Sequence, residues 1–536
     1  MEKRLVLFFV LVALTMILFQ QFVYPKRVPP AAVGPEAITD STEAAPPSPG
    51  VEEPALTEFA APAPSGDDGF MEGMLAAPAE TATVRTDYLM LKVTSVGAMV
   101  VSCELPHYRE TDKTPVSLFP EDYAGALGMT VNRGGDHALG SLPFRMDVVD
   151  HAGDSMAARV VWTARRQDGA WLRKTLEVPA EGYACRLRVE SRGLGLAGFR
   201  MTIPPGLRST ERNQRDDHNY FAAMAGIGGQ TWKQKFDKLK NGPVSSEGPT
   251  TWVGLRTKYF MAALVPDSLS WHRVTTIGGP ADGYLGVAVE GMAPGGSLDA
   301  RYTLYLGPLD YDQLAPLGGG IVHAIEMGNK YLRPIGRVIL LFLTTMHRVV
   351  TNYGLVIILF AVVMKVLLYP LSTTTTRSMR RMQELQPKIE AIKEKYKNNP
   401  QKQQQETMKL YKEQGINPLG GCLPMVLQMP IFFAMYPVLQ ASIELRGATF
   451  IPGVVGDLSQ PNPILPILMG ITQFLSGKMM ATDKQNKALV YVMPIFMTYI
   501  FFQLPSGLVL YWLTFNVLQI GEQVWQKRRA KVAPAS

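Results

Sequence analysis

The sequence predicts an α-helical polytopic membrane protein with six transmembrane helices and an added all-β sandwich domain outside the cytoplasm. Apolar residues are concentrated at the start of the chain and in its last third, although the overall hydrophobic fraction is an ordinary 47%. The middle of the chain consists of short alternating runs separated by Gly and Pro. Positive charge alternates between successive loops of the apolar region. A chain of 536 residues is too long for one compact domain.

An N-terminal transmembrane anchor is expected over residues 1–24. The apolar run 5–23 is close to the roughly 20 residues that a helix needs to cross a bilayer. Lys3 and Arg4 precede it and keep the N-terminus in the cytoplasm. A cleaved signal peptide is the alternative, but the run is long for one and Tyr24-Pro25 follows instead of a small-residue cleavage site. The pattern favours an anchor that stays attached.

Two different segments follow the anchor. Residues 25–83 are rich in Pro, Ala and acidic residues, which predicts a disordered tether because such a chain buries too little apolar surface to offset its ordering entropy. Residues 84–315 show β-type composition, as in 158–162 and 300–306, and predict a β-sandwich domain on the outer side of the membrane. Cys103 and Cys185 lie in this domain, and the sequence leaves open whether they form a disulfide.

Residues 316–350 predict an interfacial amphipathic helix region. Ile321, Ile325 and Leu332 form an apolar stripe suited to a helix in the membrane interface. The apolar run 338–346 is bracketed by Arg337 and Arg348, and the roughly eleven residues of helix that fit there cover only about 16 Å, or half the hydrocarbon core. This second piece is therefore expected to lie along the surface or to lead into the next segment.

Residues 351–526 predict a core of five helices, followed by a basic cytoplasmic tail over 527–536. The expected spans are 352–371, 418–440, 463–479, 488–504 and 508–524. Ten Lys and Arg residues lie between the first two of these, whereas the 442–462 loop carries only Arg446. This alternation predicts that both termini are cytoplasmic and that the β domain is outside. The 463–479 span is short, which favours local thinning of the bilayer.

Lys365 is a charged residue inside an expected span. An intramembrane cation is costly and usually faces protein or a water-filled cavity. Lys365 also lies about 9 Å from the cytoplasmic end of its helix, so its side chain can extend to the surface. The residues alone leave both interpretations open.

A cytoplasmic hairpin is expected over residues 377–416. Apolar residues recur at helical spacing from Met379 to Tyr396, Pro400 interrupts the pattern, and a helical composition resumes at Gln401. The hairpin is either an inert solvated element or a basic surface for anionic lipid or ribosomal RNA.

Signatures of enzymes are absent from the sequence, which predicts no catalytic residue, no cofactor and no metal site. Residues 476–479 (SGKM) resemble the end of a nucleotide-binding loop, but Thr472 stands where its first glycine belongs and Met479 replaces Ser or Thr. The seven histidines form no metal-binding motif, and no cysteine pair has metal-ligand spacing.

Four strings, in this order, are similar to those of the YidC–Oxa–Alb family of membrane protein insertases. They are 417–424 (NPLGGCLP), 428–431 (QMPI), 464–470 (ILPILMG) and 505–511 (PSGLVLY). The resemblance covers essentially the whole chain, is strongest over 350–525, and implies the Gram-negative form with a large periplasmic domain. It implies a protein of the bacterial cell inner membrane that inserts other membrane proteins and helps them to fold.

The resemblance also implies a hydrophilic groove among the five core helices, open to the cytoplasm and to lipid. A basic residue of the groove, usually Arg, is matched here by Lys365, which keeps the charge but lacks the planar guanidinium. The implied groove residues are Lys365, Gln428, Tyr511, Trp512 and Asn516. The implied apolar surface along which a substrate slides comprises Pro424, Met425, Pro430, Ile431, Met493 and Phe496.

The implied partners are nascent inner-membrane proteins, the Sec translocon, the ribosome, the signal recognition machinery and membrane lipids. The hairpin residues expected to make these contacts are Lys393, Lys395, Lys397 and Lys402. The chain is expected to be monomeric, and to act either without Sec or together with it. The alternatives are a secondary transporter or channel, which one intramembrane cation and no paired repeats disfavour, and an anchored periplasmic chaperone.

Overall fold

The computed structural model describes residues 70–71, 73–110, 112–120, 125–153, 155–203, 206–239, 242–267, 271–279, 284–328, 331–370, 373, 381–382, 384–415, 423–480 and 487–532. The anchor expected over 1–24 and the tether up to residue 69 lie outside these residues, as do 377–380 of the expected hairpin. Residues 384–415 belong to a different compact unit from the β-rich domain and the remaining helices.

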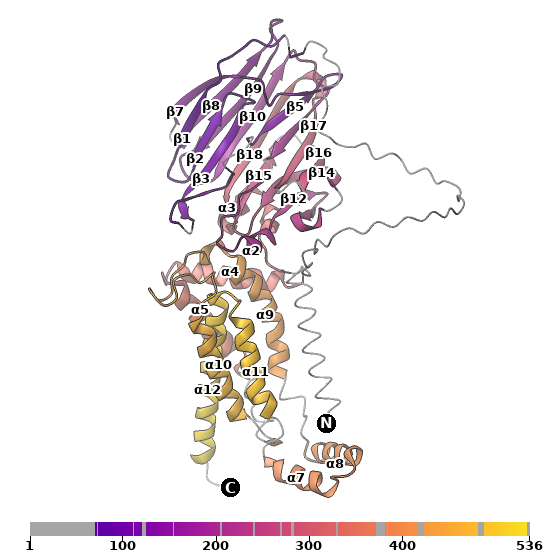
Figure 1. Cartoon of the computed structure of the whole chain (residues 1–536), viewed down its shortest axis with the longest axis vertical. Coiled ribbons are helices and arrows are strands. Elements are labelled where there is room, and N and C mark those ends of the chain that lie inside the picture. The colour runs from indigo at the N-terminus through magenta and orange to yellow at the C-terminus, as the bar shows by residue number, and fades with distance from the viewer. Residues whose placement is uncertain are drawn as a thin grey trace, which may run out of the picture. The chain divides into compact units, whose positions relative to one another are not determined.

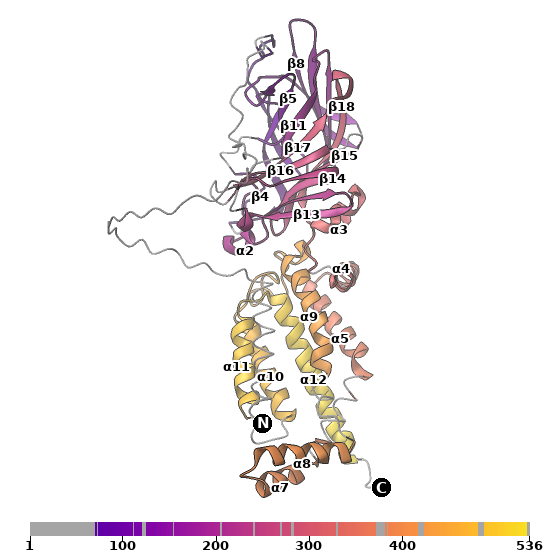
Figure 2. The same cartoon turned by 90° about the vertical axis from the view of Figure 1, so that its right-hand side faces the viewer.

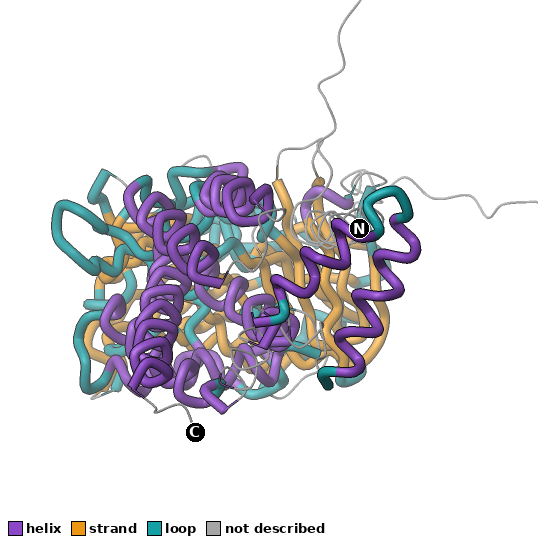
Figure 3. The backbone as a smooth tube through the Cα atoms, turned by 90° about the horizontal axis from the view of Figure 1, so that it is seen from below, coloured by secondary structure: helices purple, strands orange, loops and turns teal. Residues whose placement is uncertain are grey.

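Strands and helices, which Figure 3 draws in orange and purple, are segregated along the chain. In the part of the chain that the structure describes, every named strand lies between Thr81 and Pro308. Apart from the short helix α2 (Gln214–His218), each described α-helix begins at or after Tyr311. The prediction of a β-rich domain followed by a helical region is confirmed.

The β-rich domain contains two antiparallel sheets (Figures 1 and 2). Buried and exposed residues alternate along strands such as β9 and β10, as expected for strands with one face in a core. The small sheet comprises β1 (Thr81–Arg85), β2 (Met90–Thr94), β3 (Met99–Arg109) and β4 (Pro115–Ser117). The large sheet runs β6 (Asp136–Ala138), β5 (Gly128–Asn132), β11 (Gly198–Ile203), β17 (Tyr284–Met292), β16 (Trp271–Gly279), β14 (Ser245–Arg256), β15 (Phe260–Pro266), β18 (Leu298–Pro308), β10 (Ala184–Arg192), β9 (Trp171–Pro179), β8 (Met156–Arg165) and β7 (Arg145–Gly153), with β12 (Ala222–Ile227) and β13 (Gln230–Lys235) branching from β14.

The large sheet changes partners along the single strand β14. Its first half pairs with β16, its second half pairs with β15 and β12, and its register shifts between Glu247 and Thr250. Trp271 of β16 stacks on Tyr302 of β18 at 5.3 Å between ring centroids, although two strands separate β16 from β18 in the sheet. Both side chains are buried, so this contact lies in the core.

The packed domain begins before the expected boundary at residue 84. Phe70 is buried and stacks on His137 at 4.7 Å between ring centroids, and β1 starts at Thr81. An aromatic residue near the end of the Pro-rich segment therefore belongs to the core. Cys103 and Cys185 are both buried and are not joined by a disulfide.

The connection from the β-rich domain to the helices differs from the prediction. It contains α3 (Tyr311–Leu314) and two single 3-10 turns, Ala315–Leu317 and Ile321–Ala324, and the longer helix α4 begins only at Arg333 (Arg333–His347). The apolar stripe of Ile321, Ile325 and Leu332 was expected to lie on a helix, but Ile321 lies in a 3-10 turn, Ile325 is extended and Leu332 directly precedes α4. Gly320 and Gly328 have φ angles of 78° and 79°, and this left-handed conformation interrupts a right-handed helix.

Five helices coincide with the five apolar segments. They are α5 (Tyr353–Leu367), α9 (Leu423–Ala441), α10 (Ile464–Met480), α11 (Lys487–Phe501) and α12 (Ser506–Val532), the last of which continues beyond the expected end. Among the residues that the structure describes, no helix combines the length and the apolar character required to cross a membrane.

The basic loop forms two helices, as predicted. These are α7 (Gln386–Lys395) and α8 (Pro400–Glu413). Asn399 caps α8 by accepting a hydrogen bond from the backbone amide of Lys402, and Pro400 occupies the first turn, where a helix needs no amide donor. Leu385 and Ile389 pack against Leu410, so the apolar residues of the loop hold the two helices together.

Candidate functional site

Lys365 lies two residues before the end of α5, in an otherwise apolar helix, and is buried. Its ammonium Nζ lies 2.7 Å from Oε2 of Glu522, and the two side chains are 10% and 6% exposed. The ammonium also donates a hydrogen bond to Oε1 of Gln519 and lies 5.0 Å from the ring centroid of Phe515. Lys365 is therefore a paired cation between α5 and α12.

Helix α12 supplies all three of these contacts. Phe515, Gln519 and Glu522 are spaced by four and three residues, which places them on one face of a helix. Gln526, one turn further on, donates from Nε2 to Oε1 of Glu522 at 2.9 Å. Gln519 and Glu522 were not among the groove residues predicted from the sequence. An acidic residue inside the expected span 508–524 was the available signal, because such residues are rare in membrane helices.

The predicted groove residues lie on, or contact, two different faces of α12. Gln428 of α9 donates from Nε2 to the hydroxyl of Tyr511 at 2.9 Å, and the Tyr511 and Phe515 rings stack at 6.1 Å between centroids. Gln428 and Tyr511 therefore continue the cluster around Lys365. Asn516 instead donates to Oε1 of Gln473 on α10 at 2.9 Å.

Trp512 lies on the same side of α12 as Asn516 does, and its contacts are apolar. Its ring meets Phe432 of α9 and Phe501 of α11, at 5.5 and 5.6 Å between centroids. Trp512 thus packs between helices, and sequence reasoning could not separate it from the polar residues beside it. Gln523 further along α12 donates to Oγ of Ser476 at 3.3 Å, and neither residue was predicted.

The residues expected to form an apolar sliding surface lie on α9 and α11. Pro430 is exposed, Ile431 and Met493 are half-buried, and Phe496 is 41% exposed. For Pro424 and Met425 in the first turn of α9, only the backbone is described. Further large apolar residues of α11 are exposed, namely Tyr491, Val492, Ile495 and Tyr499.

The expected contact lysines of the hairpin lie around the turn between α7 and α8. Lys395, Lys397 and Lys402 are exposed, and Lys393 is half-buried. The ammonium groups of Lys395 and Lys402 lie 5.6 and 5.5 Å from the ring centroid of Tyr396. Their charges therefore gather at one end of the hairpin.

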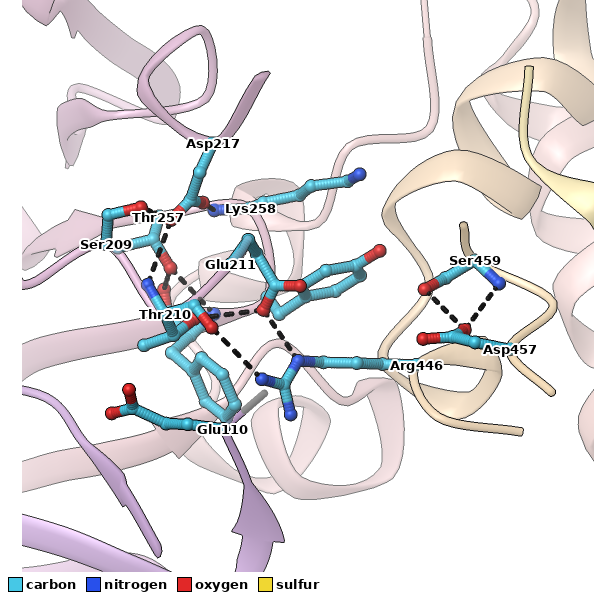
Figure 4. Close-up of polar contacts among 12 residues, drawn as sticks. Glu110, Ser209, Thr210, Glu211, Asp217, Thr257, Lys258, Arg446, Asp457 and Ser459 are labelled. Atoms are coloured by element: carbon cyan, nitrogen blue, oxygen red, sulfur yellow. Dashed lines mark hydrogen bonds and ion pairs between the residues drawn. The ribbon is translucent and has the colours of Figure 1, made fainter. Parts of the chain in front are cut away.

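A second buried ion pair, missed by the sequence analysis, lies at the base of the β-rich domain (Figure 4). Nε of Arg446, in the loop after α9, donates to Oε1 of Glu211 at 2.6 Å, and the side chains are 9% and 8% exposed. Thr210 donates to the same carboxylate oxygen at 3.1 Å. The guanidinium lies 5.8 and 5.3 Å from the ring centroids of Tyr259 and Phe260. This contact joins the β-rich domain to the helices.

Neighbouring polar groups complete this joint. Asp217 is fully buried and accepts hydrogen bonds from Ser209 Oγ at 2.7 Å and from the backbone amide of Lys258 at 3.0 Å. The hydroxyl of Tyr259 donates to the backbone carbonyl of Gln440, at the end of α9, at 3.1 Å. Burial raises the pKa of Asp217, which these hydrogen bonds oppose.

Glu444 lies in the same loop as Arg446 but has no cationic partner among the described contacts. Burial raises its pKa to about 7, and the carboxylates of Asp310 and Asp312 also raise it. The hydroxyl of Ser442 donates to it and acts in the opposite direction. Glu444 therefore changes charge near neutral pH.

Comparisons with known proteins cover both regions. The family model "YidC periplasmic domain" matches residues 81–339, and the model "60Kd inner membrane protein" matches 345–533. A membrane protein insertase YidC of Chlorobium luteolum is 34% identical over 98% of this chain and 95% of its own length. The chain belongs to the YidC family. The insertase YidC of Chlorobaculum tepidum is 32% identical over 98% of this chain and 94% of its own length.

Solved YidC structures also match. A crystal structure of an active YidC insertase with its first transmembrane domain resolved is 18% identical, with a TM-score of 0.40, over 84% of this chain and 94% of that one. The inner-membrane model spans Lys365 and Glu522, and the periplasmic model spans Glu211. The pair at the base of the β-rich domain therefore joins the two parts that the YidC models define.

Proposed function

We propose that this chain inserts apolar segments of other proteins into the bacterial inner membrane and helps them to fold. The observation that carries the proposal is the match to relatives named membrane protein insertase, at 34% and 32% identity over 98% of the chain. The substrates are nascent inner-membrane proteins. The chain is a monomer and works alone or with the Sec translocon.

The proposed topology has six spans, with both termini in the cytoplasm and the β-rich domain in the periplasm. The first span is 5–23, and the others are the five apolar segments that contain α5, α9, α10, α11 and α12. Contacts between the helices support it. Residue numbers rise together along α5 and α12, from the Phe360–Tyr511 contact to the Lys365–Glu522 contact, as expected for two helices that cross in the same direction.

Two further contact pairs support the same directions. Numbers rise together along α10 and α12, from the contact of Gln473 with Asn516 to that of Ser476 with Gln523. The end of α9 contacts the β-rich domain, since the hydroxyl of Tyr259 donates to the backbone carbonyl of Gln440. In the proposed topology, α9 ends at the periplasmic side and three helices, α5, α10 and α12, begin there, which fits the alternation of charge in the loops.

The proposed mechanism is electrostatic and apolar and uses no nucleotide. Lys365, Gln428 and Gln519 provide polar partners among apolar helices, which lowers the cost of bringing the polar tail of a substrate partway into the bilayer. The apolar segment of the substrate slides along α9 and α11, past Pro430, Ile431, Met493 and Phe496. Burial of about 20 apolar residues in lipid then drives insertion.

The hairpin is proposed to meet the incoming chain on the cytoplasmic side. The exposed Lys395, Lys397 and Lys402, with Lys393, form a basic surface suited to ribosomal RNA, the signal recognition machinery or anionic lipid. The basic tail from Lys527 adds charge of the same sign.

The proposal is tested by reconstitution of the purified full chain into liposomes with one short single-span substrate. Insertion is measured as protection of the substrate from an added protease. We expect protection that rises with the amount of chain and requires no ATP. Protection no greater than in empty liposomes would refute the proposed function.

A deletion locates the activity within the chain. Removal of 84–300 leaves 315–335, where Glu326 and its neighbours contact both the β-rich domain and α9, and should preserve most insertion. An anchored periplasmic chaperone would instead lose its activity. Complete loss of insertion by a deletion variant that remains stable in the membrane would favour that alternative.

A further inference from the structure

A carboxylate already neutralises the cation of the proposed groove. The ammonium of Lys365 lies 2.7 Å from Glu522, and both side chains are almost fully buried. Gln519 accepts a hydrogen bond from the ammonium, and Gln526 donates one to the carboxylate at 2.9 Å. Because the pair carries no net charge, it attracts a distant acidic tail only weakly. A cation that acts on acidic substrates must first exchange partners.

We propose that Glu522 is a specificity-determining residue that occupies Lys365 until a carboxylate of the substrate replaces it. When a tail carries a basic residue instead, Glu522 becomes the partner of that residue. The inference rests on the proposed function of insertion. It makes Lys365 and Glu522 a matched pair that accepts tails of either charge.

Exchange is less costly than separation of the pair. A buried charge that loses its partner is strongly unfavourable, whereas Lys365 keeps a carboxylate beside it when an acidic tail displaces Glu522, and Glu522 keeps a cation beside it when it binds a basic tail. Lys365 is suited to this role because its ammonium has three rotatable donors on a flexible stem. Glu522, once displaced, keeps the amide of Gln526 as a donor. The surroundings therefore stabilise both the resting and the exchanged arrangement.

The exchange predicts how tail charge affects insertion. In the wild type, acidic and basic tails each find a partner. The Glu522→Gln variant keeps the shape of the side chain but leaves Lys365 as an uncompensated cation. Insertion of substrates with acidic tails should therefore increase, and insertion of those with basic tails should decrease. The shorter carboxylate of Glu522→Asp keeps the charge and should keep the wild-type preference.

The experiment uses the full chain in liposomes and three single-span substrates that differ only at two tail residues, which are Asp, Asn or Lys. Protease protection gives the acidic-to-neutral and basic-to-neutral ratios. For E522Q we expect the acidic-to-neutral ratio to rise and the basic-to-neutral ratio to fall, each by about threefold. This is the effect expected from the energy of one partly screened charge contact. E522D and the control D147N, which removes an exposed carboxylate of the β-rich domain, should keep both ratios.

Two outcomes would overturn the proposal. Equal loss for all three tails, together with a lower melting temperature of E522Q, would show that Glu522 only stabilises the fold. Unchanged ratios would show that it takes no part. Failure of the wild type to insert any tail is a different result, because it refutes the proposed function itself.

A chemical cross-link tests the exchange without measuring insertion. A water-soluble carbodiimide activates a carboxylate, and a touching amine then displaces the urea to form an amide bond. Mass spectrometry should find a Lys365–Glu522 cross-link in the resting wild type and none in K365R or E522Q. A substrate arrested by a folded domain on its acidic tail should reduce this cross-link, and one with a neutral tail should not. An undiminished cross-link in the presence of the acidic tail would contradict the exchange.

Discussion

Two ion pairs of the described residues have both side chains buried to a similar extent but differ in their surroundings. Arg446 and Glu211 are 9% and 8% exposed at the base of the β-rich domain, and Lys365 and Glu522 are 10% and 6% exposed between α5 and α12. The first pair has fixed partners, since Thr210 and two aromatic rings enclose it. In the second pair, the side-chain amide of Gln519 accepts a hydrogen bond from Lys365, and that of Gln526 donates one to Glu522.

This difference separates a structural pair from an exchangeable one. The planar guanidinium of Arg446 is held by a carboxylate, a backbone carbonyl and aromatic faces, so no other partner fits without disrupting the joint. An ammonium and a carboxylate flanked by flexible amides have alternative partners nearby. Burial alone therefore does not reveal which ion pair takes part in function.

The largest effect is expected at Lys365. Lys365→Ala leaves the Glu522 carboxylate without its cation, and should reduce insertion of an acidic-tailed substrate by about tenfold or more. Lys365→Glu should do the same, whereas Lys365→Arg should retain insertion. Protease protection in liposomes measures all three. Equal activity of the three variants on an acidic tail would exclude a role for this charge and leave a side chain that only extends to the membrane surface.

Removal of the cation from the Arg446–Glu211 pair should lower the stability of the protein but should not change its preference for acidic or basic substrate tails. Arg446→Met leaves Glu211 buried without its cation, which should lower the free energy of unfolding by about 3 kcal/mol. Arg145→Met is the control, because its pair with Asp147 is exposed and should contribute less than about 1 kcal/mol. Unfolding in detergent gives both values, and E211Q/R446M should recover part of the loss. A shift in the acidic-to-neutral insertion ratio by R446M would contradict the division between the two pairs.

Glu444 should make the joint sensitive to pH. Its folded pKa of about 7 lies above its ordinary value of 4.5, so the stability it contributes is complete below pH 4.5 and is lost as pH rises through 7. Glu444→Gln should therefore stabilise the protein at pH 8 by about 3 kcal/mol and change little at pH 4.5. Melting temperatures at the two pH values measure this. A stabilisation that is the same at both would show that Glu444 does not titrate in this range.

The smallest effect is expected from the exposed charges of the hairpin. Replacement of Lys393, Lys395, Lys397 and Lys402 by Gln should reduce co-sedimentation with ribosomes by about threefold at low salt and less at high salt. The tail from Lys527 is kept unchanged as a constant background. Co-sedimentation equal to that of the wild type at every salt concentration would leave these charges as a topology signal only.

The sequence predicted most helices because their signals are local. The apolar runs place α5, α9, α10, α11 and α12, and Pro400 marks where α8 begins. It failed at 321–332, where glycines in left-handed conformations outweigh the apolar stripe. It also missed Phe70, because one aromatic residue in a Pro-rich segment gives no periodic signal.

The site was predicted only in part, for a reason of geometry. Lys365, Gln428 and Tyr511 stand out as polar groups in apolar helices, and the structure brings them into one cluster. Glu522 carries an equal signal, but its partner is 157 positions away in the sequence, and pairing depends on the rotation of α12 against α5. The same holds for Glu211 and Arg446, which lie in different parts of the chain.

By itself, the sequence determined where this protein is apolar and where it is charged. The periodicity of apolar residues and the charge of the loops are patterns among residues close together in the sequence, so they can be recognised from the sequence alone. The tertiary structure decided which charges meet. A buried ion pair depends on contact within about 4 Å between residues far apart in the sequence, and the packing of whole helices and sheets sets that distance.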